Sequence, residues 1–400
     1  MIRTPLYLAA VAVDALDVDV VATRPPFVRT EDFVSGCVLD SRGRHWMVKV
    51  PRNAGAATIL EAEAALAPAL LTQLRAGNLP FDIMRPAGSA DVEGAGRAVV
   101  YPEPFGKAAP LEELTEAQAR EFGRALAAIH LLPPDTIEEA GLPSYTVKEL
   151  RERTAAEVSN GAATGDVPAI LRRRWERLLA DDALWQFTPV VVHGDVAGEN
   201  FLWSHGTIAT VLGFGEAHVG DPARDLAPLL YLEPAAWDAI VASYENTRSI
   251  DLSEGDFRRI LFASELSVLR WLMHGVTTGN DAIRNDGIQM LGDLADHVRE
   301  DETTPITPVV PVDTPEMPVG SPIKESSATP VSILDDAEVS GPAVVPVVDG
   351  EVVDPNASSA PDAAPHPAGP DRVDKDTAGT NTGGTDGDVR GEAPDFLSGR

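Results

Sequence analysis

The sequence predicts an α+β protein with a small antiparallel β part, a larger helical part and a disordered C-terminal tail. Five short apolar segments before about residue 103 have strand character, and segments with helical periodicity follow from about residue 104 to 300. Residues 301–400 hold 15 of the 33 prolines, one aromatic residue, and 19 acidic against 5 basic residues. Such a tail buries too little apolar surface to offset its ordering entropy. We therefore expect three regions: 1–103, 104–300 and 301–400.

The N-terminal region is expected to consist of one apolar helix, five strands and a second helix. The first helix, at 5–13, could pass for a signal peptide, but the acidic residues that follow it at once favour a helix packed on the sheet. The strands are expected at 18–22, 32–39, 45–50, 79–87 and 97–101, and the second helix at 56–71.

One lysine, Lys49, lies in the apolar third strand, where burial of its charge is costly unless an anion or a carboxylate receives it. The helix that follows offers Glu61 and Glu63. The alternative is an exposed lysine on an edge strand with an ordinary solvated glutamate.

The second region contains six expected helices, at 113–131, 147–158, 168–179, 235–244, 254–271 and 282–298. Before them, residues 101–106 carry two prolines and interrupt regular structure. His130, at the end of the first of these helices, is expected to have a structural role.

Most of the candidate catalytic and metal-binding residues lie in the stretch 189–227. A strand-like run at 190–192 leads into His193-Gly194-Asp195, with Asn200 five residues after the aspartate, and a second apolar run at 208–212 leads into Gly213. Phosphoryl transfer uses a carboxylate that accepts the hydroxyl proton, an amide oxygen that holds Mg²⁺, and a second metal-binding carboxylate after a hairpin. The first two are present, and Gly213 stands in the place of the third.

In order and spacing, this block resembles the aminoglycoside/macrolide phosphotransferase family, which has a protein-kinase-like two-lobed fold. The family pattern is H-G-D-x-x-x-x-N, a strand, D-F or D-W, and then G-D-P-x-x-D-L-A. The matching positions are 193–195, Asn200, Phe214, 220–222 and 225–227. The resemblance implies transfer of a phosphoryl group from ATP or GTP, with Mg²⁺, to a hydroxyl of an aminoglycoside, a macrolide or a sugar-like metabolite.

The resemblance also implies roles for residues within the block. Asp195 would orient the acceptor hydroxyl and receive its proton, and Asn200 would bind the metal. His193 would hold the loop as a structural residue, Asp225 would tie the loop down from the following helix, and Asp221 could cap that helix.

In the N-terminal region, the resemblance implies that Lys49 pairs with Glu63 and contacts the nucleotide phosphates, since Glu63 fits the helix pattern of the family better than Glu61. The break after the fifth strand corresponds to the hinge between the lobes. The nucleotide base would therefore bind the backbone there, at Val100 and Pro102.

Gly213 leaves three interpretations open. Glu216 could substitute as the metal ligand, which requires a different course of the loop. Alternatively, Asn200 and the nucleotide phosphates could hold the metal alone, with slow catalysis. The third possibility is a catalytically impaired protein that binds a nucleotide or small molecule without turnover, so whether the chain is an enzyme is left open.

Charge and cysteine content limit the partners and the compartment. Of the net charge of −30, residues 301–400 contribute −14 and the remainder −16, which argues against nucleic acid or an anionic membrane as a partner. The acidity suits a cationic small-molecule substrate or simply keeps the surface soluble. The single cysteine, Cys37, fits the reducing cytoplasm, and no stretch approaches the roughly eighteen apolar residues of a membrane span. The tail could recruit an unknown protein partner.

Overall fold

A five-stranded antiparallel sheet forms the N-terminal part of the computed structural model, which describes residues 5–25 and 32–303. The predicted tail, 301–400, therefore lies almost entirely outside the described residues. In spatial order the strands are β1 (Val20–Arg24), β2 (Phe33–Asp40), β3 (His45–Pro51), β6 (Gly96–Pro102) and β5 (Gly88–Val92). The turn between β2 and β3 is fixed by Asp40, whose Oδ1 accepts the backbone N–H groups of Arg42 and Arg44, both at 2.9 Å.

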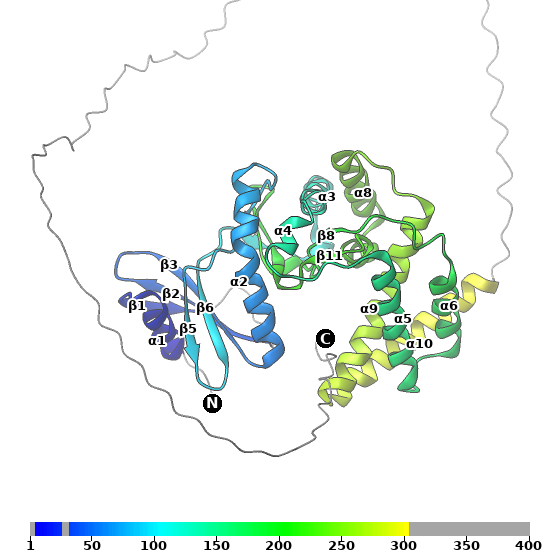
Figure 1. Ribbon diagram of the computed structural model, residues 1–400, viewed down its shortest axis with the longest axis horizontal. Coiled ribbons are helices and arrows are strands. Elements are labelled where there is room, and N and C mark those ends of the chain that lie inside the picture. Colours follow the sequence, from blue (N-terminus) through cyan, green and yellow to red (C-terminus); the bar gives the residue numbers. More distant parts are fainter. Residues whose placement is uncertain (1–4, 26–31, 304–400) are drawn as a thin grey trace, which may run out of the picture. The chain divides into compact units, whose positions relative to one another are not determined.

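Each face of this sheet is covered by one helix (Figure 1). Side chains alternate between the two faces of a strand, so the apolar strands present buried residues to both helices. From β3, Trp46, Val48 and Val50 pack in one cluster with α1 (Pro5–Leu16). The intervening Met47 packs on the other face, in the cluster that contains Leu60 of α2 (Ala54–Arg75). Lys49 shares this second face with Met47, so its side chain is directed toward α2.

The expected strand at 79–87 is wrong in most of its length. Only Asp82–Ile83 are extended with a partner, as β4, and they pair in parallel with β10 (Thr207–Val211) in a different sheet. Pro80 and Pro86 cannot donate backbone N–H groups to a ladder. The strand that pairs with β6 is instead β5, which lies between the expected strands at 79–87 and 97–101.

The second part combines helices with two smaller sheets. A four-stranded sheet has the order β4-β10-β9-β7, and a two-stranded sheet pairs β11 with β8. The predicted strands at 190–192 and 208–212 are present as β8 and β10, whereas the others were not anticipated. The bounds are β7 (Lys107–Ala108), β8 (Val190–Val192), β9 (Phe201–Ser204) and β11 (His218–Gly220).

The six predicted helices are present as α3, α5, α6, α8, α9 and α10. Local capping explains where several begin: Thr115, Thr146 and Ser253 each form a capping box with the residue three positions later. The bounds are α3 (Glu116–His130), α4 (Asp135–Glu138), α5 (Val147–Ala163), α6 (Ala169–Ala180), α7 (Ala223–Leu226), α8 (Pro234–Arg248), α9 (Glu254–Thr278) and α10 (Asp281–Thr303), with short 3-10 turns η1 (Leu111–Glu113), η2 (Gly198–Asn200), η3 (Phe214–Glu216) and η4 (Ala227–Tyr231).

The largest apolar core draws on both parts of the chain. Leu66 and Leu70 of α2 belong to the same buried cluster as Phe122 of α3 and Phe201 of β9. A second cluster in the helical part joins α6, α9 and α10 around Trp175, which is fully buried. The boundary near residue 103 between the two expected regions stays a prediction.

Helix α2 also modifies the expectation about membrane spans. Among the described residues it is the one helix long and apolar enough, by length and composition alone, to cross a membrane, with a mean hydropathy of 1.4 in its most apolar window. A core helix of a globular protein passes the same test. Glu63, buried in this helix, forms an ion pair with Lys49 of the neighbouring sheet.

Candidate active site

The loop after β8 brings Asp195 and Asn200 into direct contact. The side-chain amide of Asn200 donates from Nδ2 to Oδ2 of Asp195 at 3.0 Å and to the Asp195 backbone carbonyl at 2.9 Å. Both residues are half-buried, so their side chains remain reachable from solvent. Asn200 ends η2 and directly precedes β9, and the 3-10 turn thus places its amide back over the loop.

His193 is buried beneath this loop and bonds through both ring nitrogens. Its Nε2 lies 2.7 Å from the carbonyl oxygen of Leu212, and its Nδ1 accepts the backbone N–H of Asp195 at 3.2 Å. A carbonyl can only accept, so Nε2 carries the proton and Nδ1 is the acceptor. The imidazole thereby links the loop to the end of β10.

Asp225, in α7, holds the same loop from below. Its Oδ2 accepts the backbone N–H of His193 at 2.6 Å, and its Oδ1 accepts that of Gly194 at 2.9 Å. Burial raises the pKa of this carboxyl, but the hydrogen bond and charge of His130 and the backbone N–H groups outweigh burial and lower the pKa to about 2. Asp225 is therefore a buried carboxylate at neutral pH.

A chain of polar side chains extends from Asp225 through the helical part. Nε2 of His130 lies 3.0 Å from Oδ2 of Asp225, and Nδ1 of His130 lies 2.7 Å from the hydroxyl of Tyr244, which Arg248 contacts in turn. His130 thus has the structural place that the sequence suggested. Tyr244 and Arg248 were missed, since no local pattern connects α8 with a residue 114 positions away.

Gly213 lies opposite Asn200. Its φ of +78° is in the left-handed region that favours glycine, and a β-carbon there would stand 2.8 Å from Oδ1 of Asn200. The side-chain amide group of Asn200 therefore lies against the position where the family has an aspartate.

Glu216, the proposed substitute ligand, lies in η3 just after Gly213. Its Oε2 is 3.7 Å from a terminal nitrogen of Arg224, while Nε of Arg224 donates to the Gly194 carbonyl at 3.4 Å. The structure thus places the Glu216 carboxylate beside a cation at the edge of the loop. Its role as a metal ligand stays a prediction.

Asp221 lies just before α7. Its carboxylate accepts the backbone N–H of Ala223 at 2.9 Å and pairs with Arg259 at 3.1 Å.

Lys49 and Glu63 meet on the α2 face of the sheet, with Nζ and Oε2 3.0 Å apart. The Lys49 side chain is 17% exposed and that of Glu63 is 4% exposed, and Nζ lies 4.9 Å from the centre of the Phe33 ring. Two buried atoms nearby, Oε1 of Glu63 and the hydroxyl of Tyr101, have no hydrogen-bond partner among the described residues. Burial raises the pKa of Tyr101 far above its usual value, with a further contribution from Glu63. Glu61 is not part of this contact.

The two backbone positions proposed for the base differ in their environment. Val100 pairs with both neighbouring strands, and its carbonyl accepts the N–H of Ala87 at 2.8 Å. Pro102 pairs with Trp46 of β3 and lies beyond the last residue pair of β5 with β6. Carbonyls two residues apart on a strand point to the same side, so that of Pro102 is directed away from β3. The carbonyl of Val100 is thus already engaged within the sheet. The carbonyl of Pro102 is therefore the better placed of the two to accept a hydrogen bond from a nucleotide base.

Comparison with known proteins identifies the family. A model described as "Phosphotransferase enzyme family" matches residues 37–260, more than half of the chain. Viomycin phosphotransferase of Streptomyces vinaceus is 31% identical over 202 residues, which cover 47% of this chain and 67% of that protein.

Solved structures show the same fold at lower identity. The macrolide 2'-phosphotransferase of Brachybacterium faecium superposes with a TM-score of 0.57 and 21% identity, over 68% of this chain and 93% of that chain. The GDP complex of a variant of aminoglycoside 2'-phosphotransferase-IIIa gives a TM-score of 0.61 and 16% identity, over 75% of this chain and 100% of that chain. The two-lobed protein-kinase-like fold expected from the sequence is thus confirmed, and the chain belongs to the phosphotransferase enzyme family.

Proposed function

We propose that the protein transfers the γ-phosphoryl group of ATP or GTP to a hydroxyl group of a small molecule, with an antibiotic of the viomycin, macrolide or aminoglycoside type as the acceptor. One observation carries this proposal: Asp195 and Asn200 are joined at 3.0 Å on a loop that the buried carboxylate of Asp225 fixes. A phosphoryl-transfer enzyme mainly positions its reactants and stabilises charge, so a loop fixed in this way suits the chemistry.

Asp195 is assigned the acceptor hydroxyl. Asn200 occupies Oδ2 of the carboxylate, and the second oxygen, Oδ1, can receive the hydroxyl proton as the phosphoryl group is transferred. Asn200 thereby restricts how the carboxylate rotates, while His193 and Asp225 keep the backbone of the loop in place. His193 is not available as a general base, because both of its ring nitrogens are already hydrogen-bonded.

Lys49 is proposed to bind the nucleotide phosphates. Buried polar atoms are normally hydrogen-bonded, and the unpartnered Oε1 of Glu63 and hydroxyl of Tyr101 lie beside Lys49. A nucleotide with its water shell would supply the missing partners. The GDP complexes among the solved relatives support a purine nucleotide, with ATP and GTP both candidates.

The oxygens of the loop fit Mg²⁺, which prefers oxygen ligands and keeps several waters. Asn200, with Asp195 beside it, would hold the ion together with nucleotide phosphates, and bound Mg²⁺ would neutralise phosphate charge during transfer. The described residues contain no group of three or more His, Cys, Asp or Glu side chains placed to hold a metal. The protein would therefore contribute few ligands, in keeping with Gly213.

The acceptor is proposed to be a small cationic molecule. The chain carries a net charge of −30, and its relative from Streptomyces vinaceus is named for viomycin. A cytoplasmic location fits this proposal, since nucleoside triphosphates are present there and Cys37 would stay reduced. Neither nucleic acid nor a membrane surface is proposed as a partner.

The test is phosphotransfer to viomycin, kanamycin and a macrolide with ATP or GTP, followed by mass spectrometry of the acceptor. The parent protein should form a monophosphate with at least one acceptor, and Asp195→Asn should lower kcat by roughly 10²- to 10⁴-fold. Asp91→Asn is the matched control, because Asp91 is 92% exposed in the sheet and should leave kcat unchanged. Equal activity of the Asp195 variant and the parent would refute the assigned role.

A second candidate function is binding of a nucleotide or small molecule without turnover, and Gly213 favours it. The glycine removes a carboxylate from the site, and the amide of Asn200 fills the adjacent space. Nucleotide binding by calorimetry, combined with absence of phosphotransfer and nucleotide hydrolysis with either Mg²⁺ or Mn²⁺, would establish this function instead.

A further inference from the structure

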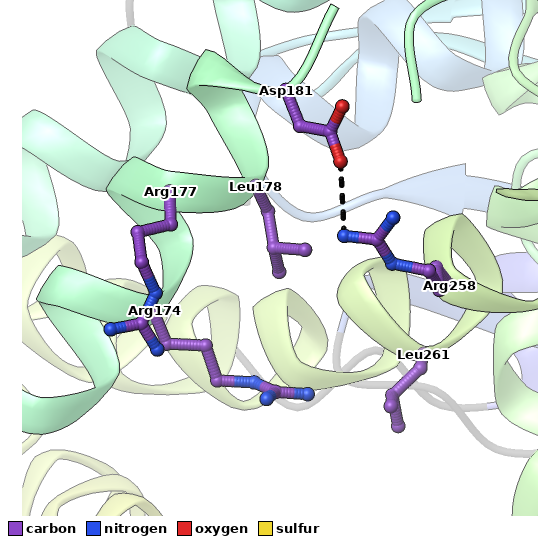
Figure 2. Close-up of a pocket in the computed structure, with 6 residues that line it drawn as sticks. All are labelled: Arg174, Arg177, Leu178, Asp181, Arg258 and Leu261. Carbon is purple, nitrogen blue, oxygen red and sulfur yellow. Dashed lines mark ion pairs between the residues drawn. The ribbon is translucent and has the colours of Figure 1, made fainter. Parts of the chain in front are cut away.

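A surface pocket of about 360 Å³ lies in the helical part, between α6 and α9, among residues that the proposed function does not use. Figure 2 shows its lining: α6 and the residue after it contribute one wall and the first turns of α9 the other. The lining residues are Arg174, Arg177, Leu178, Asp181, Arg258 and Leu261. A volume of this size is sufficient for a small ligand.

The charge of the lining is opposite to that of the whole molecule. Three arginines and one aspartate face the pocket, whereas the chain as a whole carries a net charge of −30. A guanidinium offers N–H donors in a planar fork that matches the oxygens of a carboxylate or a phosphate. An arginine-lined hollow in an acidic protein therefore favours an anionic ligand.

Arg174 is held in place by a buried carboxylate. Its Nε donates to both oxygens of Glu265, at 2.9 and 3.2 Å, and Glu265 also accepts the indole N–H of Trp175 at 2.7 Å. Glu265 is 3% exposed and Trp175 is fully buried. These bonds orient Arg174 through Nε alone. The guanidinium carries four further N–H groups on its two terminal nitrogens, and these bonds to Glu265 do not engage them.

Arg258 faces the pocket from α9 and is paired with Asp181 at 3.0 Å, the contact drawn as a dashed line in Figure 2. The two side chains are 44% and 32% exposed. An ion pair this exposed is weak and easily exchanged for another partner. The Asp181 carboxylate thus occupies a place that an anionic ligand could take.

We propose that this pocket binds a small ligand through one oxyanion group, a phosphate or a carboxylate, held between Arg174 and Arg258. Leu178 and Leu261 contact the apolar part of the ligand, and Asp181 acts as an internal competitor for Arg258. We place this ligand apart from the nucleotide phosphates and the reacting hydroxyl, because neither Lys49 nor Asp195 lines the pocket.

The test is calorimetric titration of the full chain at low ionic strength with inorganic phosphate in one arm and succinate in the other. Arg258→Gln should weaken binding about fivefold or more, because a charge-assisted bond is lost. Asp181→Asn should strengthen binding about twofold or more, because Arg258 is released from its partner. The arm that binds more tightly identifies the group as a phosphate or a carboxylate.

Arg173→Gln is the matched control, since it removes the same charge from an exposed position of α6 that does not line the pocket. It should change the affinity less than about twofold, the effect of long-range charge alone. Thermal melts verify that each variant is folded, and Arg258→Lys, which keeps the charge but loses the planar fork, replaces Arg258→Gln if the latter does not fold. The proposal is overturned if neither anion binds, if the Arg258 and Arg173 variants behave alike, or if Asp181→Asn weakens binding.

Discussion

The side-chain oxygen of Asn200 lies 2.8 Å from the point where a β-carbon on Gly213 would stand. A side chain at the position where glycine replaces the aspartate of the family would thus meet Asn200, a proposed metal ligand. Its φ of +78° adds a backbone requirement to this steric one. An aspartate cannot be restored at this position unless Asn200 moves.

Substitution of Gly213 is therefore expected to destabilise the protein. Gly213→Ala should lower the free energy of unfolding by more than about 1 kcal/mol, because the left-handed backbone is strained for alanine and the new methyl group contacts Asn200. Gly206→Ala is a matched control: its φ is +81°, and nothing lies within 4 Å of the position of its β-carbon. Urea denaturation of both variants separates the two contributions, and equal losses would mean that Asn200 adjusts freely.

Substitutions of Lys49 and Glu63 are expected to affect protein stability and nucleotide binding differently. Lys49→Met leaves the Glu63 carboxylate, 4% exposed, without its cation, so the free energy of unfolding should fall by about 3 kcal/mol. Nucleotide affinity should fall at least about tenfold, since one phosphate contact is lost.

The double variant Lys49→Met, Glu63→Gln tests this assignment. A neutral glutamine no longer leaves a buried charge unpaired, so stability should recover while nucleotide affinity stays low. Calorimetry with ATP and GTP measures the second property and thermal denaturation the first. Recovery of both would show that Lys49 acts on the fold alone.

Asp225 should make stability depend on pH in the acid range. Its folded pKa of about 2 lies below the ordinary value of 3.8, so its contribution is complete above pH 4 to 5 and is lost as the pH falls toward 2. Asp225→Asn should cost about 2 kcal/mol at pH 7, and this difference should shrink as the pH falls below 4. Urea denaturation between pH 7 and 3 measures it, with the exposed Asp91→Asn as the control. A difference that is the same at both ends of the range would contradict the low pKa.

Removal of residues 304–400 should leave the melting temperature nearly unchanged. The expectation rests on composition, because these residues contain almost no aromatic side chains and are strongly acidic. Differential scanning calorimetry of the full and shortened chains compares the two. A fall of many degrees would show that the tail contributes to the folded core.

Local sequence was sufficient wherever the structural signal is local. The apolar segment 45–50 and the helical periodicity of residues 113–131 mark elements that the structure contains close to their predicted positions. The prediction of a strand at 79–87 failed although Phe81 and Ile83 are buried, as alternate residues of a strand would be. The strand that pairs with β4 lies more than a hundred residues further along the chain. Hydrophobicity reports burial and does not report the pairing partner.

The same limit applies to the site. Asp195, Asn200 and Lys49 could be proposed from the sequence because motif spacing or an unusual charge marks them. Tyr244 carries no such mark, since an aromatic residue in an amphipathic helix is ordinary, and only the folded chain shows its hydroxyl 2.7 Å from His130. The basic pocket between α6 and α9 was equally invisible, because its arginines come from segments about eighty residues apart.

The shared core of α2, α3 and β9 has a consequence for dissection of the chain. Leu66 and Leu70 on one side of residue 103 are buried against Phe122 and Phe201 on the other. Cleavage at that point would create two fragments, each with an apolar surface that fits its counterpart. Such fragments, produced together, would reassemble by complementation, and either one alone would tend to aggregate.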